Sequence, residues 1–326
     1  MTFSPASLWG RLDDVQADAG YDADHPPRKG FFTDTSVCIG CKACEVACKE
    51  WNMVPDDGFM LTGMSYDNTQ GLSADTWRHV AFIEKPIDVP VPVSQGASAS
   101  TRASAPAGVE AADLGMPTMG PPSVVHPDPQ GADPQGADGM RWLMSSDVCK
   151  HCTHAACLDN CPTGALFRTE FGTVVVQPDV CNGCGYCVPS CPYGVIDMRE
   201  GDGRAWKCTM CYDRLKDDET PMCAKACPTE SIQFGDLTEL RQRAEARVEE
   251  LHAKGVDVAR LYGADPNDGV GGDGAFFLLL DEPEVYGLPP DPVVTTRDLG
   301  SIWKHVGMAA AGLAALGVAS FVGGRR

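Results

Sequence analysis

Residues 181–192 read Cys-Asn-Gly-Cys-Gly-Tyr-Cys-Val-Pro-Ser-Cys-Pro, the most informative stretch of this sequence. Its four cysteines follow the spacing C-x2-C-x2-C-x3-C, and Pro192 comes directly after the last of them. Thiols this close together can converge on one inorganic core through a tight loop. Similar spacings recur along the chain, so the whole sequence has to be interpreted around its cysteines.

The chain has 326 residues and 16 cysteines, and every cysteine belongs to one of four groups of four. The stretch quoted above is the third group. The first group has the same spacing but is followed by Lys49 instead of proline. The second and fourth groups are spaced C-x2-C-x4-C-x3-C and C-x2-C-x11-C-x3-C, and each precedes a proline. In chain order the groups are Cys38, Cys41, Cys44 and Cys48; Cys149, Cys152, Cys157 and Cys161; Cys181, Cys184, Cys187 and Cys191; and Cys208, Cys211, Cys223 and Cys227.

So many cysteines either form disulfides in an oxidising compartment or hold metal, and their spacing separates these cases. The third group matches the bacterial ferredoxin run C-x2-C-x2-C-x3-C-P without deviation. Zinc sites more often use two C-x2-C pairs separated by a longer loop. The pattern therefore favours four [4Fe–4S] clusters, with a zinc-stapled structural protein as the alternative. The fourth group fits least well, because its eleven-residue gap also suits a zinc knuckle.

In a two-cluster ferredoxin the first three cysteines of a group hold one cluster and the fourth holds the other. The second and third groups are neighbours in the sequence, so we expect them to exchange fourth ligands. The first and fourth groups bracket this pair and are expected to exchange likewise. The predicted ligand sets are Cys38, Cys41, Cys44 and Cys227; Cys208, Cys211, Cys223 and Cys48; Cys149, Cys152, Cys157 and Cys191; and Cys181, Cys184, Cys187 and Cys161.

These sets predict an α+β protein made of two nested bacterial-ferredoxin-like modules, each with two [4Fe–4S] clusters. A segment rich in Pro, Gly and Ala interrupts the first module, and its composition predicts a flexible insertion. The expected divisions are an acidic N-terminal arm at 1–30, the first module at 31–93 plus 199–235, the insertion at 94–139, the second module at 140–198, a C-terminal helix and partner-contact region at 236–300, and a membrane anchor at 301–326.

Periodicity predicts a few elements around the cysteines. A strand is expected at 79–83, a hairpin at 166–171 and 173–177, and a further strand at 275–280. Apolar residues at helical spacing predict a packing helix at 236–254, with Gly255 as its C-terminal stop.

Residues 306–324 form an uncharged run of 19 residues. A helix of that length reaches roughly 28 Å, close to the thickness of a bilayer's hydrocarbon core. Small residues recur at every fourth position from Gly307 to Gly323, as expected where another membrane helix packs closely. We therefore expect a single membrane anchor, the alternative being an Ala-rich helix packed on a partner subunit. The anchor's orientation is open, because basic residues flank both ends.

Charge excludes another class of function. The chain has 26 basic and 45 acidic side chains, a formal net charge of −19. Nucleic-acid binding needs clustered Lys and Arg to neutralise phosphates, so none is expected. The N-terminal residues have no basic stretch followed by an apolar core, so no signal peptide is expected.

The run from Cys38 to Asn52, Cys-Ile-Gly-Cys-Lys-Ala-Cys-Glu-Val-Ala-Cys-Lys-Glu-Trp-Asn, resembles the first cluster motif of the iron–sulfur β subunits of molybdopterin-dependent formate dehydrogenases. The order of the four groups, the gap in the fourth, the C-terminal helix and the tail from Glu284 to Pro292 are also similar to that family. The resemblance covers nearly all of the chain except the insertion and the acidic arm.

The resemblance implies an electron-transfer subunit with two kinds of partner. One is a catalytic α subunit with a molybdenum or tungsten bis-pterin cofactor that oxidises formate. The other is a possible cytochrome b-type membrane γ subunit that passes electrons to quinone. Four-cluster subunits of dimethyl sulfoxide, polysulfide and nitrate reductases, and of some hydrogenases, share the cysteine plan and remain alternatives.

No acid–base pair, nucleophile or nucleotide loop stands out in the sequence, so this protein is not expected to be catalytic by itself. The expected location is the cell membrane, through the anchor. The chain would reach the outer face only by travelling folded with a signal-bearing partner, and would otherwise lie on the cytoplasmic face.

Overall fold

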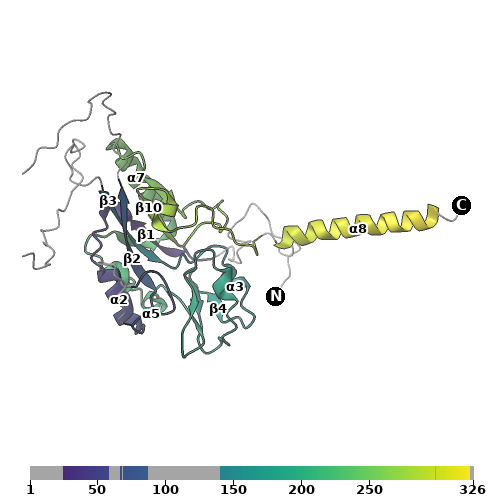
Figure 1. The fold of residues 1–326 in the computed structure, drawn as a ribbon, viewed down its shortest axis with the longest axis horizontal. Coiled ribbons are helices and arrows are strands. Elements are labelled where there is room, and N and C mark those ends of the chain that lie inside the picture. The colour runs from purple at the N-terminus through teal and green to yellow at the C-terminus, as the bar shows by residue number, and fades with distance from the viewer. Residues whose placement is uncertain (1–24, 59–66, 68, 87–139, 298, 324–326) are drawn as a thin grey trace, which may run out of the picture. The chain divides into compact units, whose positions relative to one another are not determined.

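The structure, a computed structural model, describes residues 25–58, 67, 69–86, 140–297 and 299–323 (Figure 1). The insertion expected at 94–139 and most of the N-terminal arm lie outside these residues. The described part mixes helices and strands, in agreement with the α+β class. One compact unit comprises 1–84 and 142–326, and the other comprises 85–141, of which only two strand ends are described.

The largest sheet has four strands in the order β8-β1-β10-β9. Its strands are β1 (Lys29–Asp34), β8 (Ile232–Asp236), β9 (Arg260–Tyr262) and β10 (Ala275–Leu279). Strand β1 runs parallel to β10 and antiparallel to β8, while β9 is antiparallel to β10. Strands from distant parts of the chain therefore lie side by side. All four cysteine groups lie between β1 and β8 in the sequence, so the pairing of these two strands brings the two ends of the cysteine-rich region together.

Both faces of this sheet are covered. Successive side chains of a strand point to opposite faces. Phe32 and Phe276 stack with 5.3 Å between ring centroids and share a core with helix α7 (Leu237–Ala253). Phe31, one residue earlier, belongs to a different core that contains cysteines of the first, second and fourth groups. The sheet thus separates an ordinary apolar core from a cysteine-rich one.

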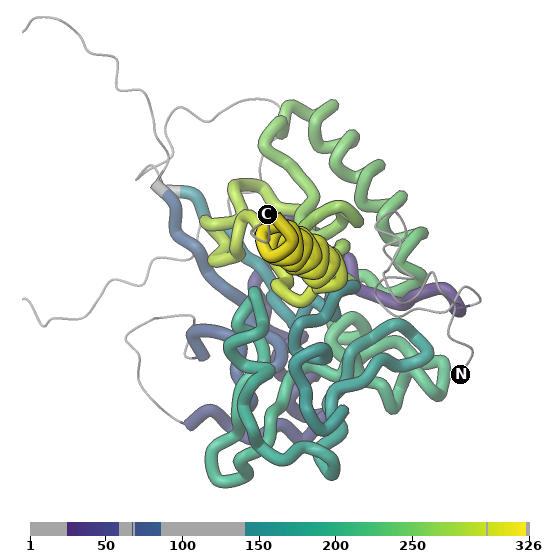
Figure 2. Tube along the Cα trace, turned by 90° about the vertical axis from the view of Figure 1, so that its right-hand side faces the viewer, coloured from purple at the N-terminus to yellow at the C-terminus, as the bar shows by residue number. Residues whose placement is uncertain are grey.

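Short helices carry many of the cysteines. Helices α2 (Ala43–Asn52) and α6 (Met222–Lys225) contact each other and carry cysteines of the first and fourth groups. Helices α3 (Ala156–Asp159) and α4 (Cys187–Ser190) contact each other and carry cysteines of the second and third groups. In Figure 2, α7 (green) lies away from the teal segments that hold the second and third groups.

Smaller elements complete the described chain. Three two-stranded sheets pair β2 with β3, β4 with β5, and β6 with β7. These strands are β2 (Arg78–Pro86), β3 (Met140–Val148), β4 (Leu166–Arg168), β5 (Val174–Val176), β6 (Asp197–Met198) and β7 (Ala205–Trp206). The remaining short elements are the 3-10 helices η1 (Thr35–Val37) and η2 (Pro283–Tyr286) and helix α5 (Tyr212–Lys216).

Most elements expected from periodicity are present. Strands β4 and β5 form the expected hairpin, α7 fills the helix expected at 236–254, and β10 fills the strand expected at 275–280. The expected strand at 79–83 is confirmed within the longer β2. Strands β1 and β8 were not expected, because each is short and finds its partners only through long-range pairing. Strand β1 begins at Lys29, inside the segment assigned to the N-terminal arm.

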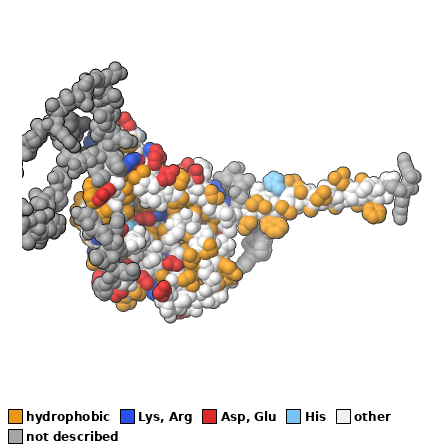
Figure 3. Space-filling model, in the orientation of Figure 1, with side chains coloured by type: hydrophobic (Ala, Val, Ile, Leu, Met, Phe, Trp, Pro, Cys, Tyr) orange, Lys and Arg blue, Asp and Glu red, His pale blue; other side chains and the backbone are white. Residues whose placement is uncertain are grey.

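The C-terminal helix α8 (Leu299–Gly323) contains almost all of the uncharged run at 306–324. Among the described helices, it alone is long and apolar enough to cross a membrane, and none of its residues is buried. Its visible face in Figure 3 is largely hydrophobic (orange) or white. An apolar helix that buries nothing against its own chain has its surface free for lipid or for another subunit.

The pairing of β1 with β10 predicts that Phe276→Ala strongly destabilises the folded protein. Phe276 is fully buried and stacked on Phe32, so truncation removes a ring from the closed core. We expect a loss of about 3–5 kcal/mol in the free energy of unfolding, measured by urea titration. Val258→Ala is the control, because Val258 is 44% exposed, and it should cost less than about 0.5 kcal/mol. Equal losses in the two variants would contradict this description of the core.

Candidate metal centres

All sixteen cysteines lie within the described residues, and none forms a disulfide. Only Cys41 and Cys184 are exposed, and seven others are half-buried. The buried ones are Cys44, Cys48, Cys149, Cys187, Cys208, Cys211 and Cys223. Fourteen of the sixteen cysteines are therefore at least half-buried, and a buried sulfur atom needs a chemical partner or an apolar neighbour.

One cavity is bordered by cysteines of the second and third groups. It has an empty volume of about 370 Å³, including the space at its open side, and Lys150, His151 and Lys207 also line it. The four cysteines at this cavity, called set III below, are Cys149, Cys152, Cys157 and Cys191. Three of them come from the second group and one is the last cysteine of the third.

A second cavity is bordered by cysteines of the first and fourth groups and has a volume of about 290 Å³, including the space at its open side. Lys42, Ser146 and Ser231 are among its other lining residues. The four cysteines here, called set I, are Cys38, Cys41, Cys44 and Cys227. As in set III, three belong to one group and the fourth belongs to its partner group.

The remaining eight cysteines form two further sets by proximity. Burial raises the pKa of Cys48 well above its ordinary value, and the neighbouring thiols of Cys208, Cys223 and Cys211 raise it further. Burial likewise raises the pKa of Cys187 to about 11, with contributions from three thiols around it. Set II comprises Cys48, Cys208, Cys211 and Cys223. Set IV comprises Cys161, Cys181, Cys184 and Cys187.

The first turn of each cysteine group has the same backbone conformation. In every group the residue just before the second cysteine has a positive φ: Gly40 (65°), His151 (46°), Gly183 (73°) and Met210 (56°). Glycine adopts this left-handed conformation freely, but a residue with a side chain does so at a cost. His151 and Met210 accept that cost, so the second and fourth groups fold like the first and third despite their different spacings.

The end of each group explains the role of the proline. Three residues after the last cysteine of the second, third and fourth groups, Gly164, Gly194 and Glu230 have positive φ and donate a backbone hydrogen bond to that cysteine's carbonyl. The intervening proline cannot continue a helix, which favours this turn. The first group has Lys49 instead, and α2 continues to Asn52.

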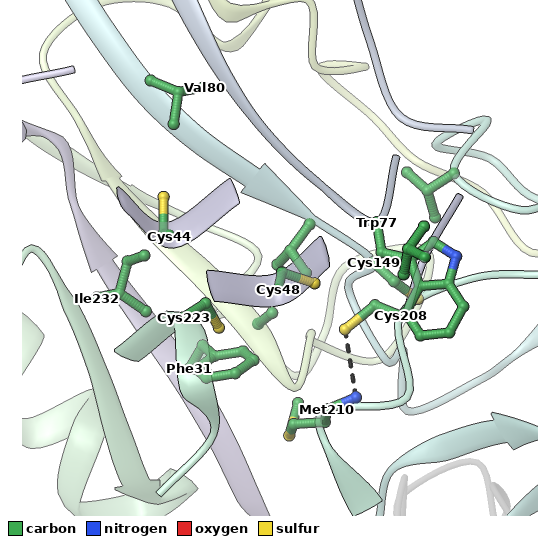
Figure 4. Close-up of a cluster of buried hydrophobic side chains, with 14 of the residues drawn as sticks. Phe31, Cys44, Cys48, Trp77, Val80, Cys149, Cys208, Met210, Cys223 and Ile232 are labelled. Atoms are coloured by element: carbon green, nitrogen blue, oxygen red, sulfur yellow. Dashed lines mark hydrogen bonds between the residues drawn. The ribbon is translucent and has the colours of Figure 1, made fainter. Parts of the chain in front are cut away.

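The longer α2 gives the first group a different donor. The Nδ2 of Asn52 lies 3.7 Å from Sγ of Cys48 and 3.8 Å from Sγ of Cys211. Both sulfurs belong to set II, so one amide faces two thiols of the same set. Other donors approach single sulfurs. The backbone nitrogen of Met210 lies 3.2 Å from Cys208 Sγ and donates the hydrogen bond drawn as a dashed line in Figure 4.

Buried cations accompany the cysteines. Arg78 is 2% exposed, and its Nη2 lies 3.2 Å from Cys223 Sγ. Lys207 is also 2% exposed and lines the cavity of set III. Burial lowers the pKa of both cations, but the surrounding cysteines raise it above the ordinary value. Sequence reasoning missed Arg78, Lys207 and Asn52, because no spacing rule marks them.

The residues present fit iron–sulfur clusters. Burial raises the pKa of Cys44 to about 11, although Arg78 opposes the rise, and burial raises that of Cys208 to about 12. Such thiols stay neutral unless a metal removes the proton, which coordination does outright. The Nε of Arg78 has no hydrogen-bond partner among the described residues. A buried cation beside four thiols calls for an anionic core, and a thiolate-ligated cluster supplies one.

Two histidines lie near the cysteines, and one of them has a structural role. His151 and His154 lie among the cysteines and are both buried. The Nδ1 of His151 accepts a hydrogen bond from the backbone N–H of Val174 at 3.1 Å, so this ring supports the loop around set III.

Two family models match the chain, and both are described as 4Fe-4S dicluster domains. One covers residues 37–165 and the other covers 140–237. Together they span all four cysteine groups.

Known proteins similar to this chain are subunits of oxidoreductase complexes. The nitrate-inducible formate dehydrogenase iron–sulfur subunit of Escherichia coli (strain K12) is 35% identical over 92% of this chain and 84% of its own length. The formate dehydrogenase iron–sulfur subunit of Haemophilus influenzae is 35% identical over 91% of this chain and 79% of its own length. A subunit of the anaerobic dimethyl sulfoxide reductase of E. coli is less similar, at 29% identity over 66% of this chain and 76% of its own length.

The two dicluster matches and the sixteen cysteines give the chain multiple [4Fe–4S] clusters. Identity of 35% across most of the chain decides among the iron–sulfur subunits that share this cysteine plan. The protein belongs to the family of formate dehydrogenase iron–sulfur subunits.

Proposed function

We propose that this chain relays electrons for a formate dehydrogenase through four [4Fe–4S] clusters held by sets I to IV. The observation that carries the proposal is that thiols from two different cysteine groups border each cavity. When bound, each cluster supplies one-electron redox chemistry at a potential set by its surroundings. The residues of the chain hold the clusters, exclude water from them and set the charge around them.

The four sets form a series from one exposed cysteine to another. Set I neighbours set II, because α2 contacts α6 and Cys44 shares a buried core with Cys223. Set II neighbours set III through Cys208 and Cys149, which are adjacent in Figure 4. Set III neighbours set IV, since α3 contacts α4.

The ends of this series suit exchange with partners. Of the sixteen cysteines only Cys41, in set I, and Cys184, in set IV, are exposed. Large apolar side chains lie exposed next to both, Ile39 at one end and Tyr186 at the other. Exposed apolar residues beside a redox group are typical of docking surfaces. Electrons would therefore enter and leave at sets I and IV.

The shared thiol sets support nested modules. In this arrangement the second and third groups form an inner module and the first and fourth form an outer one. The contact of α3 with α4 and that of α2 with α6 favour it. The composition of 94–139 supports a flexible insertion in the outer module.

The family suggests the partners of this chain. We propose a catalytic subunit with a molybdenum or tungsten bis-pterin cofactor as the electron donor and a cytochrome b-type membrane subunit as the acceptor. This chain would perform no chemistry on formate itself. Helix α8, apolar and without buried residues, would anchor it in the membrane.

Formate reduction of the clusters tests this proposal. Adding formate to the purified native complex should reduce clusters in this chain, detected by electron paramagnetic resonance. The same chain separated from its partners should show no reduction by formate. The alternative is a relay in a dimethyl sulfoxide-type reductase, favoured by the weaker match to a subunit of that enzyme. It predicts that dimethyl sulfoxide reoxidises the clusters and that formate leaves them unchanged.

Exchange of fourth ligands predicts where a cysteine substitution acts. Cys191 lies in the third group but borders the cavity of set III. We expect Cys191→Ala to convert or abolish the cluster of set III, because one of its four thiolates is lost, and to leave that of set IV intact. Cys161→Ala is the matched control and should damage set IV instead. Spectra in which Cys191→Ala damages only set IV would overturn the exchange.

Helix α8 predicts the behaviour of a truncated protein. A truncation just before Leu299 removes α8, none of whose residues at 299–323 is buried, so the clusters should be retained. The truncated protein should be released from membranes by an alkaline carbonate wash, whereas the full chain should stay with them. A full chain that washes off would show that α8 contacts a subunit instead of lipid.

A further inference from the structure

Two buried cations each lie between consecutive thiol sets. Arg78, on β2, reaches both set I and set II. Its Nη2 donates to Cys223 Sγ of set II at 3.2 Å. Its Nη1 lies 3.2 Å from the carbonyl and 3.3 Å from the hydroxyl of Ser146. That hydroxyl lies 3.2 Å from Cys44 Sγ of set I. One guanidinium therefore contacts a sulfur of set II directly and a sulfur of set I through the hydroxyl of Ser146.

Lys207 lies between sets II and III, as Arg78 lies between sets I and II. It directly precedes Cys208 of set II, and its Nζ donates to the Cys208 carbonyl at 3.1 Å. Its Nζ also donates to the carbonyl of Val174, a residue that lines the cavity of set III. Lys207 lines the same cavity, beside Cys149 and Cys157.

Neither cation has a carboxylate partner in the described part of the protein. The ion pairs among those residues include several buried or half-buried cations, such as Lys150 with Asp147 and Arg214 with Glu219, but not Arg78 or Lys207. An unpaired charge at 2% exposure is strongly unfavourable. The charge that offsets each of these two cations therefore has to come from the thiolates and the group they hold.

A cation between two clusters affects how easily each of them is reduced, because the clusters are negatively charged. Four thiolates around an oxidised core leave a net negative charge, and reduction adds one more electron. Adjacent negative clusters disfavour each other's reduction, and a cation between them offsets that repulsion for both.

Resting on the proposed ligand sets, we propose that Arg78 and Lys207 are shared counter-ions that raise the reduction potentials of the clusters on either side. Arg78 acts on sets I and II, and Lys207 acts on sets II and III. Set II touches both cations, so its cluster depends on both. Set IV touches neither.

The test is a potentiometric titration of the native complex followed by electron paramagnetic resonance. Arg78→Gln should make reduction of the clusters of sets I and II about tenfold less favourable, or about 59 mV lower for one electron. Lys207→Gln should do the same for sets II and III. In the double variant the two effects should multiply at set II alone. The cluster of set IV is the internal reference, and its equilibrium constant for reduction should stay within about twofold of the native value.

Charge-keeping variants separate charge from shape. In Arg78→Lys and Lys207→Arg the equilibrium constant for reduction of every cluster should stay within about threefold of its native value. If a Gln variant assembles no clusters, the charge-keeping variant decides. Assembly with near-native potentials supports the proposal, whereas failure of both variants shows that the side chain's shape matters and overturns it.

Two further outcomes have distinct meanings. Four clusters with unchanged potentials in the Gln variants, or an equal shift at all four, would overturn the counter-ion role and leave the relay intact. A native complex in which this chain holds other than four clusters would overturn the ligand sets, and with them the relay as proposed.

Discussion

Burial of thiols next to cations is the constraint on which the rest of this structure depends. Seven cysteines are buried, and burial raises the pKa of Cys208 to about 12. A neutral thiol gives nothing to offset the buried charges of Arg78 and Lys207, whereas a metal-bound thiolate does. An iron–sulfur core satisfies the sulfurs and the cations together. The cysteine-rich core containing Phe31 is then organised around the clusters, and the four-stranded sheet closes it on one side.

The cysteine spacing predicted the cluster-binding loops because each loop is formed by residues close together in the sequence. The common turn before the second cysteine appears in all four, including those where His151 and Met210 stand in place of glycine. Periodicity also predicted α7 and the β4–β5 hairpin, since both depend on nearby residues. Fold class and cofactor type follow from these local features.

Long-range features were beyond the sequence. Strand β1 has only six residues, and its pairing with β10 depends on how the cysteine region folds between them. Arg78 is one arginine in a strand, and nothing in its neighbours reveals that Cys223 lies 3.2 Å away. Asn52 belongs to the run that resembles formate dehydrogenase subunits, but only the structure shows its amide facing two sulfurs of set II. The cysteines mark where metal binds, and distant side chains control the charge around it.

The relay depends on one claim above all, that every cysteine group contributes to an iron–sulfur cluster. The most direct measurement is the iron and acid-labile sulfide content of the anaerobically purified protein. Four clusters require about four iron atoms and four sulfides for each cysteine group, or about sixteen of each per chain. Zinc in place of iron, or about half that amount of iron in a fully assembled protein, would contradict the relay described above.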